Sequence, residues 1–204
     1  MEYQSAVKLL FTNSLDNLVF LDIETTGLDP EKGAKIVEIA MLKVCGGIEE
    51  RYESLVNPGL PIPAECSKIH AICDDMVKNS PLFDEIAGDV FSFIGHSIVV
   101  CHNAPFDLFF VHRELYRVGM PAKNVRYIDT LELARQYFSF DSNKLGNIAD
   151  AIGVEVELRH RAMADVLTMF SVAKYIFANI YRKGMDMVES SVYKYNPDKR
   201  PPRI

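Results

Sequence analysis

The chain has 204 residues, with 22 lysines and arginines against 28 aspartates and glutamates, so its formal net charge is −6. This excess of acid argues against a protein that holds nucleic acid mainly through a basic surface, although not against nucleic acid gripped through metal ions in a local site. The composition is ordinary for a globular protein, and the length suffices for one ample core with a small appendage.

The sequence shows no sign of export or of a membrane. Residues 1–17 mix charged and apolar side chains and lack the apolar core of a signal peptide, so we expect an N-terminal arm or helix there. No apolar run is expected to be long enough to cross a bilayer. The four cysteines form no C-x-x-C pair, which predicts reduced thiols. These features favour a cytoplasmic protein, or a nuclear or organellar one where the host has such compartments.

The first expected strand covers residues 18–24 and ends in two acids. The run Leu18–Leu21 is typical of a strand that is buried on both faces. Because side chains alternate along a strand, Asp22 and Glu24 should point to the same side of the sheet. Two neighbouring carboxylates resist ionising, and a hard divalent cation such as Mg²⁺ or Mn²⁺ relieves their repulsion. Two solvated acids at a strand end are the alternative, and this pair alone does not decide between them.

An antiparallel meander should follow the first strand. The turn-forming segment 25–30 leads to a second strand over 35–44. Gly46–Gly47 predicts a hairpin turn before a third strand over 49–56.

From residue 64 onward, helical and strand patterns alternate. Strands are expected over 97–101 and 125–129. Helices are expected over 64–70, 73–78, 80–94, 105–118, 130–138, 143–152 and 161–181. This order predicts an α/β fold with a mixed five-stranded sheet, three antiparallel strands followed by two parallel ones, flanked by helices. Residues 18–181 would form this domain, and residues 182–204 would form a C-terminal extension.

The second group of candidate residues follows the fourth strand. His102 lies at the end of that strand, and Asp107 lies in the first turns of the next helix. Sites in such sheets gather at strand ends, which favours a functional role. The alternative is local helix chemistry, with Asn103 as the cap and Asp107 favoured by the helix dipole. We interpret Asp129 mainly as the cap of the helix that follows the fifth strand.

The third group is His160 and Asp165, which lie five residues apart. In a helix this spacing turns the second side chain about 140° away from the first. If both side chains serve one site, His160 must therefore lie at or before the start of the last helix, with Asp165 on its rigid face. A surface histidine and a solvated aspartate are the alternative.

The three groups together resemble the motifs of the DEDD exonuclease superfamily, in its histidine-bearing, DnaQ-like branch. The matching segments are Asp22–Gly27, His102–Asp107 and His160–Asp165, with lesser similarity at Val56–Gly59, Ile69–Ile72 and Asp129–Arg135. The resemblance extends over about residues 18–180, and Ala71 stands where the family often has glycine. The branch includes the proofreading epsilon subunit of bacterial DNA polymerase III and RNase T, and it implies an RNase H-like fold.

The resemblance implies a metal-dependent 3′-5′ exonuclease that releases 5′-mononucleotides. Asp22, Glu24, Asp107 and Asp165 would bind two Mg²⁺ or Mn²⁺ ions, which would hold the attacking and leaving oxygens of an in-line displacement. His160 would be the general base, because imidazole ordinarily titrates near neutral pH.

The substrate would meet the loop that follows the first strand. By resemblance, Thr25 and Thr26 would receive the terminal nucleotide and its 3′-hydroxyl. Ile69 and His70 would pack against its base or sugar, although core packing is an alternative for Ile69. Asn103 would contact the substrate or only cap its helix.

Two further assignments have competing interpretations. His102 competes with His160 for the role of general base. Cys66, His70 and Cys73 lie close together in the sequence but supply only three zinc ligands, so we favour small buried thiols over a zinc site.

Three functions remain open. The first is an exonuclease on the 3′ ends of single-stranded DNA, acting alone or as a proofreading subunit of a DNA polymerase. The second is RNA 3′-end trimming, because the metals cannot discriminate the sugars and the sequence reveals no contact to a 2′-hydroxyl. The third is a non-catalytic nucleic-acid-binding module, which is disfavoured because all four carboxylates and the histidine are present. The oligomeric state stays open.

Overall fold

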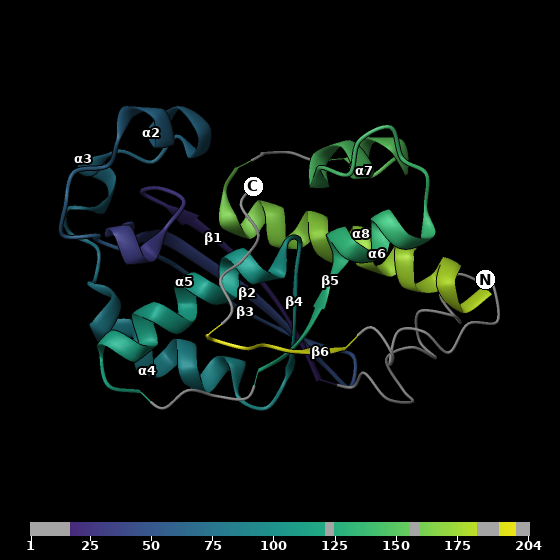
Figure 1. The fold of residues 1–204 in the computed structure, drawn as a ribbon, viewed down its shortest axis with the longest axis horizontal. Helices are drawn as coiled ribbons and strands as arrows, with labels where there is room; N and C mark the ends of the chain where they lie inside the picture. The colour runs from purple at the N-terminus through teal and green to yellow at the C-terminus, as the bar shows by residue number, and fades with distance from the viewer. Residues whose placement is uncertain (1–16, 121–124, 156–159, 183–191, 199–204) are drawn as a thin grey trace.

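The structure, a computed structural model, describes residues 17–120, 125–155, 160–182 and 192–198. Within these residues the centre is a six-stranded sheet in the order β3-β2-β1-β4-β5-β6 (Figure 1). The strands are β1 (Asn17–Thr25), β2 (Ile36–Cys45), β3 (Ile48–Leu55), β4 (Ile98–Cys101), β5 (Arg126–Asp129) and β6 (Tyr193–Lys194). The helices are η1 (Pro30–Lys32), α2 (Ala64–His70), α3 (Asp74–Val77), α4 (Phe83–Ile94), α5 (Ala104–Arg117), α6 (Thr130–Tyr137), α7 (Leu145–Ala151) and α8 (Ala162–Arg182).

β1 lies inside the sheet and has an antiparallel neighbour on one side and a parallel neighbour on the other. Asp22 pairs with Ala40 of β2, and Phe20 pairs with Val100 of β4. β2 and β3 form the predicted antiparallel hairpin, and β4 and β5 run parallel. The predicted α/β fold with a mixed sheet flanked by helices is therefore confirmed.

The sheet has one strand more than the sequence predicts. Tyr193–Lys194, from the segment expected as an extension, pairs antiparallel with Arg126 and Tyr127 of β5. Two residues in a polar tail give no alternating pattern, so the sequence carries no strand signal there. The N-terminal arm expected over 1–17 lies outside the described residues, except for Asn17, which begins β1.

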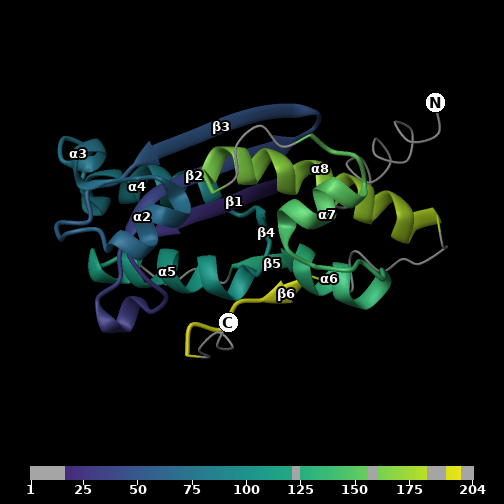
Figure 2. The same cartoon turned by 90° about the horizontal axis from the view of Figure 1, so that it is seen from above.

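Helices cover both faces of the sheet (Figure 1). One face packs on α6, α7 and α8, and the other packs on α4 and α5. Leu18 and Phe20 are fully buried on the first face, and Val19 is fully buried on the second. α8 lies along β1 and β2 (Figure 2). Because side chains alternate, Asp22 and Glu24 continue the row of Leu18 and Phe20 and belong to the α8 face.

The sequence predicts Ser80 as the N-cap of α4 and Pro81 in its first turn, but the helix begins two residues later. Its N-cap position is Leu82, and the first helical residue is Phe83. The Glu85 carboxylate accepts a hydrogen bond from the Leu82 N–H at 2.7 Å. This contact satisfies a donor at the helix start without help from Ser80.

We expected no apolar run long enough to cross a bilayer. By length and composition alone, however, the segment Ala162–Tyr181 of α8 is long and apolar enough to do so. Its mean hydropathy is 1.2, and half of that window is buried inside the protein. Val166, Met169 and Val172 are fully buried in the core that α8 forms with the sheet. Packing against the sheet accounts for these apolar side chains.

β2 contains one extra residue opposite the end of β1. Glu24 pairs with Glu38, but Thr25 pairs with Ile36, so Val37 forms a β-bulge. Val37 is fully buried in a small hydrophobic cluster whose other buried members are Ile62, Ile72 and Val77. The bulge therefore anchors the segment around α2 and α3 beside the end of β1.

Candidate active site

Acidic side chains from distant parts of the chain meet at the end of β1. Asp22 and Glu24 come from β1, and Asp165 comes from the first turn of α8. One carboxylate oxygen from each of these three residues lies within 4.8 Å of the others, and all three residues are partly buried. The shared orientation of Asp22 and Glu24 is the one that strand alternation predicts.

Asp107 adds a fourth carboxylate to the electrostatics of this trio. It lies in the first turn of α5 and is only 3% exposed. Burial raises the pKa of Asp22 well above its usual range, and the charges of Asp107, Asp165 and Glu24 raise it further. Burial also raises the pKa of Asp107, and the Asp129 and Glu24 charges act in the same direction. Asp107 thus acts electrostatically on Asp22, but its carboxylate is not one of the three whose oxygens lie within 4.8 Å of one another.

The surroundings of Glu24 show a deficit of positive charge among the described residues. Burial raises the pKa of Glu24 to about 8, and the charges of Asp165 and Glu38 add to this effect. Arg161 acts in the opposite direction, but its guanidinium is already bonded to Glu38 at 2.6 Å. The donor set consists of carboxylate oxygens, which hard divalent cations such as Mg²⁺ and Mn²⁺ prefer. These residues therefore fit a divalent metal site.

Without divalent metal, the free energy of unfolding should fall as the pH rises from about 7 to about 8. The folded protein retains a proton on Glu24, whose pKa is about 8, whereas the unfolded chain has released it. Burial also raises the pKa values of Asp22 and Asp107, which acts in the same direction. Burial lowers the pKa values of His70 and His102 below 6.5. For these two rings, the free energy of unfolding therefore rises with pH only in the range below 6.5. The pH window above 7 therefore reports the carboxylates.

Urea unfolding in EDTA, at several pH values between about 6.5 and 8.5, measures this dependence. Saturating Mn²⁺ should remove the fall, because the ion stabilises the ionised carboxylates. A flat or rising stability above pH 7 in EDTA would contradict the described electrostatics.

Asp129 holds the start of α5, the helix that carries Asp107. Its carboxylate accepts hydrogen bonds from the N–H groups of Asn103 and Ala104 at 3.0 and 3.1 Å. It also accepts one from the Leu131 N–H at 2.9 Å, which confirms Asp129 as the cap of α6. Asn103 has a left-handed backbone with φ 80°, and its side chain makes no cap hydrogen bond. The side-chain cap considered for Asn103 is thus supplied by Asp129 instead.

His102 is engaged at both ring nitrogens. Nε2 donates to the Asn143 carbonyl at 2.8 Å, and Nδ1 lies 2.9 Å from the Thr130 hydroxyl. Burial lowers the pKa of the ring. His102 therefore links β4 to α6 and to the segment before α7, and it offers no open nitrogen to a reacting water.

His160 lies before the start of α8, as the five-residue spacing requires. The residue is exposed, and its backbone has a left-handed φ of 59°. Its N–H donates to Asp165 Oδ2 at 3.1 Å. The histidine of the third motif is therefore tied through its backbone to a member of the carboxylate trio.

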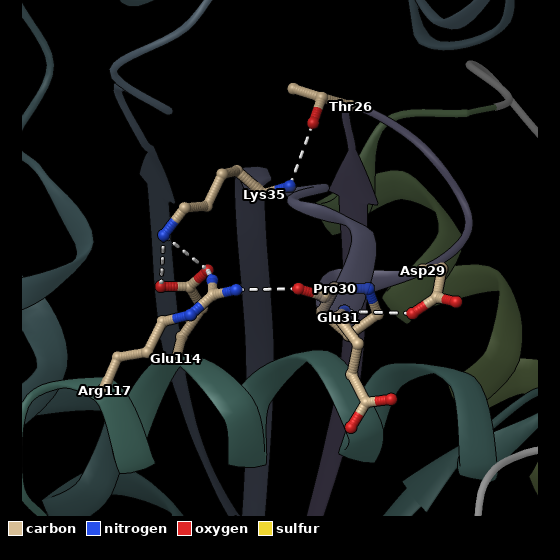
Figure 3. A network of polar contacts seen from close by, with 7 residues as sticks. All are labelled: Thr26, Asp29, Pro30, Glu31, Lys35, Glu114 and Arg117. Atoms are coloured by element: carbon tan, nitrogen blue, oxygen red, sulfur yellow. Dashed lines mark hydrogen bonds and ion pairs between the residues drawn. The ribbon is translucent and has the colours of Figure 1, made fainter.

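The loop after β1 is held against α5 by a polar network (Figure 3). Thr26 and Lys35 exchange two hydrogen bonds of 2.9 Å, one through the Thr26 hydroxyl and one between backbones. The Lys35 ammonium lies 3.2 Å from Glu114 of α5. Arg117 donates to Glu114 and to the Pro30 carbonyl, at 2.7 Å each. Because α5 also carries Asp107, the network fixes the position of Asp107 relative to the loop.

Replacing Glu114 by glutamine should lower the free energy of unfolding by about 1–3 kcal/mol, because two cations then lose a charged partner that is almost fully buried. Urea unfolding at pH 6.5 in EDTA measures the change. Asp75→Asn, which breaks an exposed ion pair with Lys78, is the matched control and should change stability by less than about 1 kcal/mol. Equal effects of the two substitutions would contradict a structural role for the network.

Ile69 and His70 lie at the end of α2 with opposite exposure. Ile69 is 59% exposed, so core packing does not account for it. His70 is 2% exposed, and its Nδ1 accepts a hydrogen bond from the Ile72 N–H at 3.0 Å. Burial lowers the pKa of His70, while the Thr25 backbone and the Glu38 charge act in the opposite direction. His70 is thus an interior residue next to the site, and only Ile69 presents an open surface.

The zinc alternative gains no support from the described residues. Among them, the acid trio is the one group of three histidine, cysteine or acidic ligands close enough to hold a metal, and Cys66, His70 and Cys73 do not form another. The expectation of buried thiols is wrong for Cys73, which is exposed, and Cys66 is only partly buried.

Sequence reasoning missed the charged side chains that support the site. Glu38 is the one acid in β2, so a lone charge in an apolar strand was an available signal. Arg161 directly follows His160 and pairs with Glu38. Lys35 and Glu114 lie 79 positions apart, and nothing in either local pattern indicates their pairing.

The family model described as "Exonuclease" (RNase_T) matches residues 19–173. Among curated proteins, the 3′-5′ exonuclease DinG of Bacillus subtilis (strain 168) is 35% identical over 167 residues, which cover 81% of this chain and 18% of that protein. The DNA polymerase III subunit epsilon of Rickettsia typhi is 37% identical over 126 residues, which cover 59% of this chain and 55% of the subunit. The chain thus spans less than a fifth of the DinG relative and about half of the epsilon relative.

Solved structures show the same fold. Exonuclease X in complex with 5′ overhanging duplex DNA superposes with a TM-score of 0.62 at 26% identity, covering 85% of this chain and 97% of that chain. Escherichia coli exonuclease I in complex with a dT13 oligonucleotide gives a TM-score of 0.73 at 18% identity, covering 83% of this chain and 42% of that chain. The second likeness concerns the fold alone.

Proposed function

The chain belongs to the exonuclease family, and on that premise we propose that it hydrolyses phosphodiester bonds at the 3′ ends of single-stranded DNA, in the 3′-5′ direction, and releases 5′-mononucleotides. The observation that carries this proposal is the meeting of Asp22, Glu24 and Asp165 within 4.8 Å, with Asp107 in the same electrostatic site. We take residues 18–181 together with β6 as the nuclease unit, which we place in the cytoplasm.

The four carboxylates would bind the metal on which the reaction depends. Asp22, Glu24, Asp107 and Asp165 would hold two Mg²⁺ or Mn²⁺ ions, which when bound supply a polarised water and neutralise charge on the phosphoryl oxygens. Burial and mutual repulsion disfavour the ionised form of these carboxylates, and a bound cation would relieve that cost.

His160 would act as the general base and accept the proton of the attacking water. Its position at an exposed edge suits a base, because the proton can then pass to solvent. His102, the competing candidate, is engaged at both nitrogens.

The loop after β1 and the end of α2 would receive the terminal nucleotide. The Thr25 hydroxyl donates to the Gly27 carbonyl at 2.7 Å and Thr26 is paired with Lys35, so the loop is shaped before substrate binds. Ile69 would pack against the base, whereas His70 would pack from the interior beside the end of β1. Asn103 would contact the substrate next to the carboxylates.

The choice of DNA rests on relatives. Exonuclease X, 26% identical, is in complex with DNA, and the epsilon relative is named as a DNA polymerase III subunit, which makes a polymerase a possible partner of this chain. The complete set of carboxylates and the histidine supports an enzyme over a non-catalytic binding module.

Incubation with 5′-labelled single-stranded DNA and RNA oligonucleotides, in Mg²⁺, Mn²⁺ or EDTA, tests the function. We expect stepwise shortening of linear DNA from the 3′ end, no cutting of circular single-stranded DNA, and no reaction in EDTA. Faster shortening of RNA would replace DNA by RNA as the substrate. Tight binding without shortening in either metal would defeat the enzyme assignment.

A further inference from the structure

Arg161 and Glu38 form an unusually complete ion pair beside the carboxylate trio. Arg161 Nε lies 3.1 Å from both carboxylate oxygens of Glu38, and Nη2 lies 2.6 Å from Oε1. Oε2 also accepts a hydrogen bond from the Ala162 N–H at 2.9 Å. The Glu38 side chain is 9% exposed. Several donors thus converge on one nearly buried carboxylate.

This pair joins two segments that also carry predicted site residues. Glu38 is the register partner of Glu24 across the β1–β2 ladder. Arg161 directly follows His160, and its neighbour Ala162 begins α8. Capping of the helix explains the contact to the Ala162 N–H, but it does not explain the three contacts to the guanidinium.

His160 needs support because its backbone is left-handed, with φ 59°. A residue with a Cβ atom is disfavoured in this conformation, so surrounding contacts must hold it. One contact is the hydrogen bond from the His160 N–H, before the helix, to Asp165 Oδ2 in the first turn of α8, at 3.1 Å. The other is the bonding of the next residue, Arg161, to Glu38. One contact is thus made by His160 itself and the other by the residue that follows it.

The ion pair with Glu38 also determines where the positive charge of the Arg161 guanidinium lies. Arg161 is close enough to Glu24 for each charge to act on the other. A guanidinium that turned toward Glu24 would compete with a divalent cation for the same oxygens. Bonding to Glu38 therefore leaves the carboxylates of the trio open for a cation.

We propose that Glu38 and Arg161 are positioning residues, which fix His160 for proton transfer and keep the Arg161 guanidinium away from the metal-binding carboxylates. This inference rests on the proposed nuclease function. It assigns no contact with substrate or water to either residue.

Arg161→Lys keeps the charge but loses the planar fork, so it tests the positioning of His160. We expect kcat to fall about 10- to 100-fold with KM within about twofold of wild type. We also expect faster amide hydrogen exchange in the peptide that spans 160–165. The control is Arg113→Lys, which alters a similarly exposed arginine paired with Glu31 and should leave kcat, KM and exchange unchanged.

Glu38→Gln removes the charge that holds the guanidinium, so it tests the second half of the proposal. Mn²⁺ binding, measured by calorimetry without substrate, should weaken about tenfold, while Arg161→Lys should bind Mn²⁺ within about threefold of wild type. If Arg161→Lys does not unfold cooperatively and is therefore not folded as the wild type is, the same hydrogen-exchange and calorimetry measurements on Glu38→Gln test the proposal.

Unchanged kcat and exchange in Arg161→Lys, a change confined to KM, or unchanged Mn²⁺ affinity in Glu38→Gln would overturn the proposal. Calorimetry and exchange require no turnover. Absence of nuclease activity in the wild type would therefore defeat the proposed function, while the metal-binding and exchange results would still test the positioning role of Glu38 and Arg161 by themselves.

Discussion

Replacement of Asp22 by asparagine should abolish hydrolysis at every metal concentration, with a loss of about 10³-fold or more. Asparagine keeps the size of the side chain but removes a charge that lies next to Glu24, Asp107 and Asp165. With fewer anionic ligands, the site would hold its cations too weakly and too loosely to stabilise the transition state. Single-turnover assays over a wide range of Mg²⁺ and Mn²⁺ concentrations measure the loss.

The same substitution should stabilise the metal-free protein. Burial and four neighbouring carboxylates disfavour the charged form of Asp22 in the folded state, a cost that asparagine does not have. The urea midpoint of Asp22→Asn in EDTA at pH 8 should therefore exceed that of wild type. Asp89→Asn, on the exposed face of α4, is the control for loss of one charge and should change neither activity nor midpoint. Recovery of activity at high metal, or a lower midpoint, would contradict this account of Asp22.

Replacement of His160 by alanine should lower turnover on the order of 10²-fold or more, because general-base catalysis contributes about that much. Fold and metal affinity should be retained, since His160 contributes its backbone N–H, and not its side chain, to the contact with Asp165. The loss should be largest in kcat, and it should decrease at high pH, where hydroxide replaces the base. Steady-state kinetics from pH 6 to about 9 and calorimetry with Mn²⁺ measure these quantities.

His96→Ala is the matched control for this experiment, because His96 is also exposed and lies in the turn between α4 and β4, at the opposite end of β4 from the carboxylates. It should leave kcat unchanged. Near-normal turnover of His160→Ala would remove His160 from the role of base. A loss of Mn²⁺ binding equal to the loss of turnover would instead make it a ligand.

Much of the fold follows from local patterns in the sequence. The apolar run into Asp22 and the Gly46–Gly47 turn predict β1 and the β2–β3 hairpin, because burial and turn geometry act over a few residues. β6 could not be predicted, because its two residues are defined by pairing with β5 and not by their own pattern. The start of α4 was misplaced because the Glu85 carboxylate, three residues beyond Leu82, caps the helix.

The acidic residues of the site were predicted because strand alternation and helix spacing restrict where such side chains can point. The structure brings Asp22, Glu24 and Asp165 together, whereas their metal-binding role stays a prediction. The supporting contacts were not predicted. Glu38 meets Arg161 across 123 positions of sequence, and a pairing of that range depends on how β2 and α8 pack. Local pattern therefore indicates the ligands more readily than the residues that hold them.

The bulge at Val37 limits how this chain can change in length. Val37 is the extra residue that lets Glu24 pair with Glu38 while Thr25 pairs with Ile36. Deletion of Val37 would leave both pairs in place but would remove the side chain that packs against Ile62, Ile72 and Val77, so natural homologues should tolerate length variation at the exposed Gly46–Gly47 hairpin but keep the extra residue between Ile36 and Glu38.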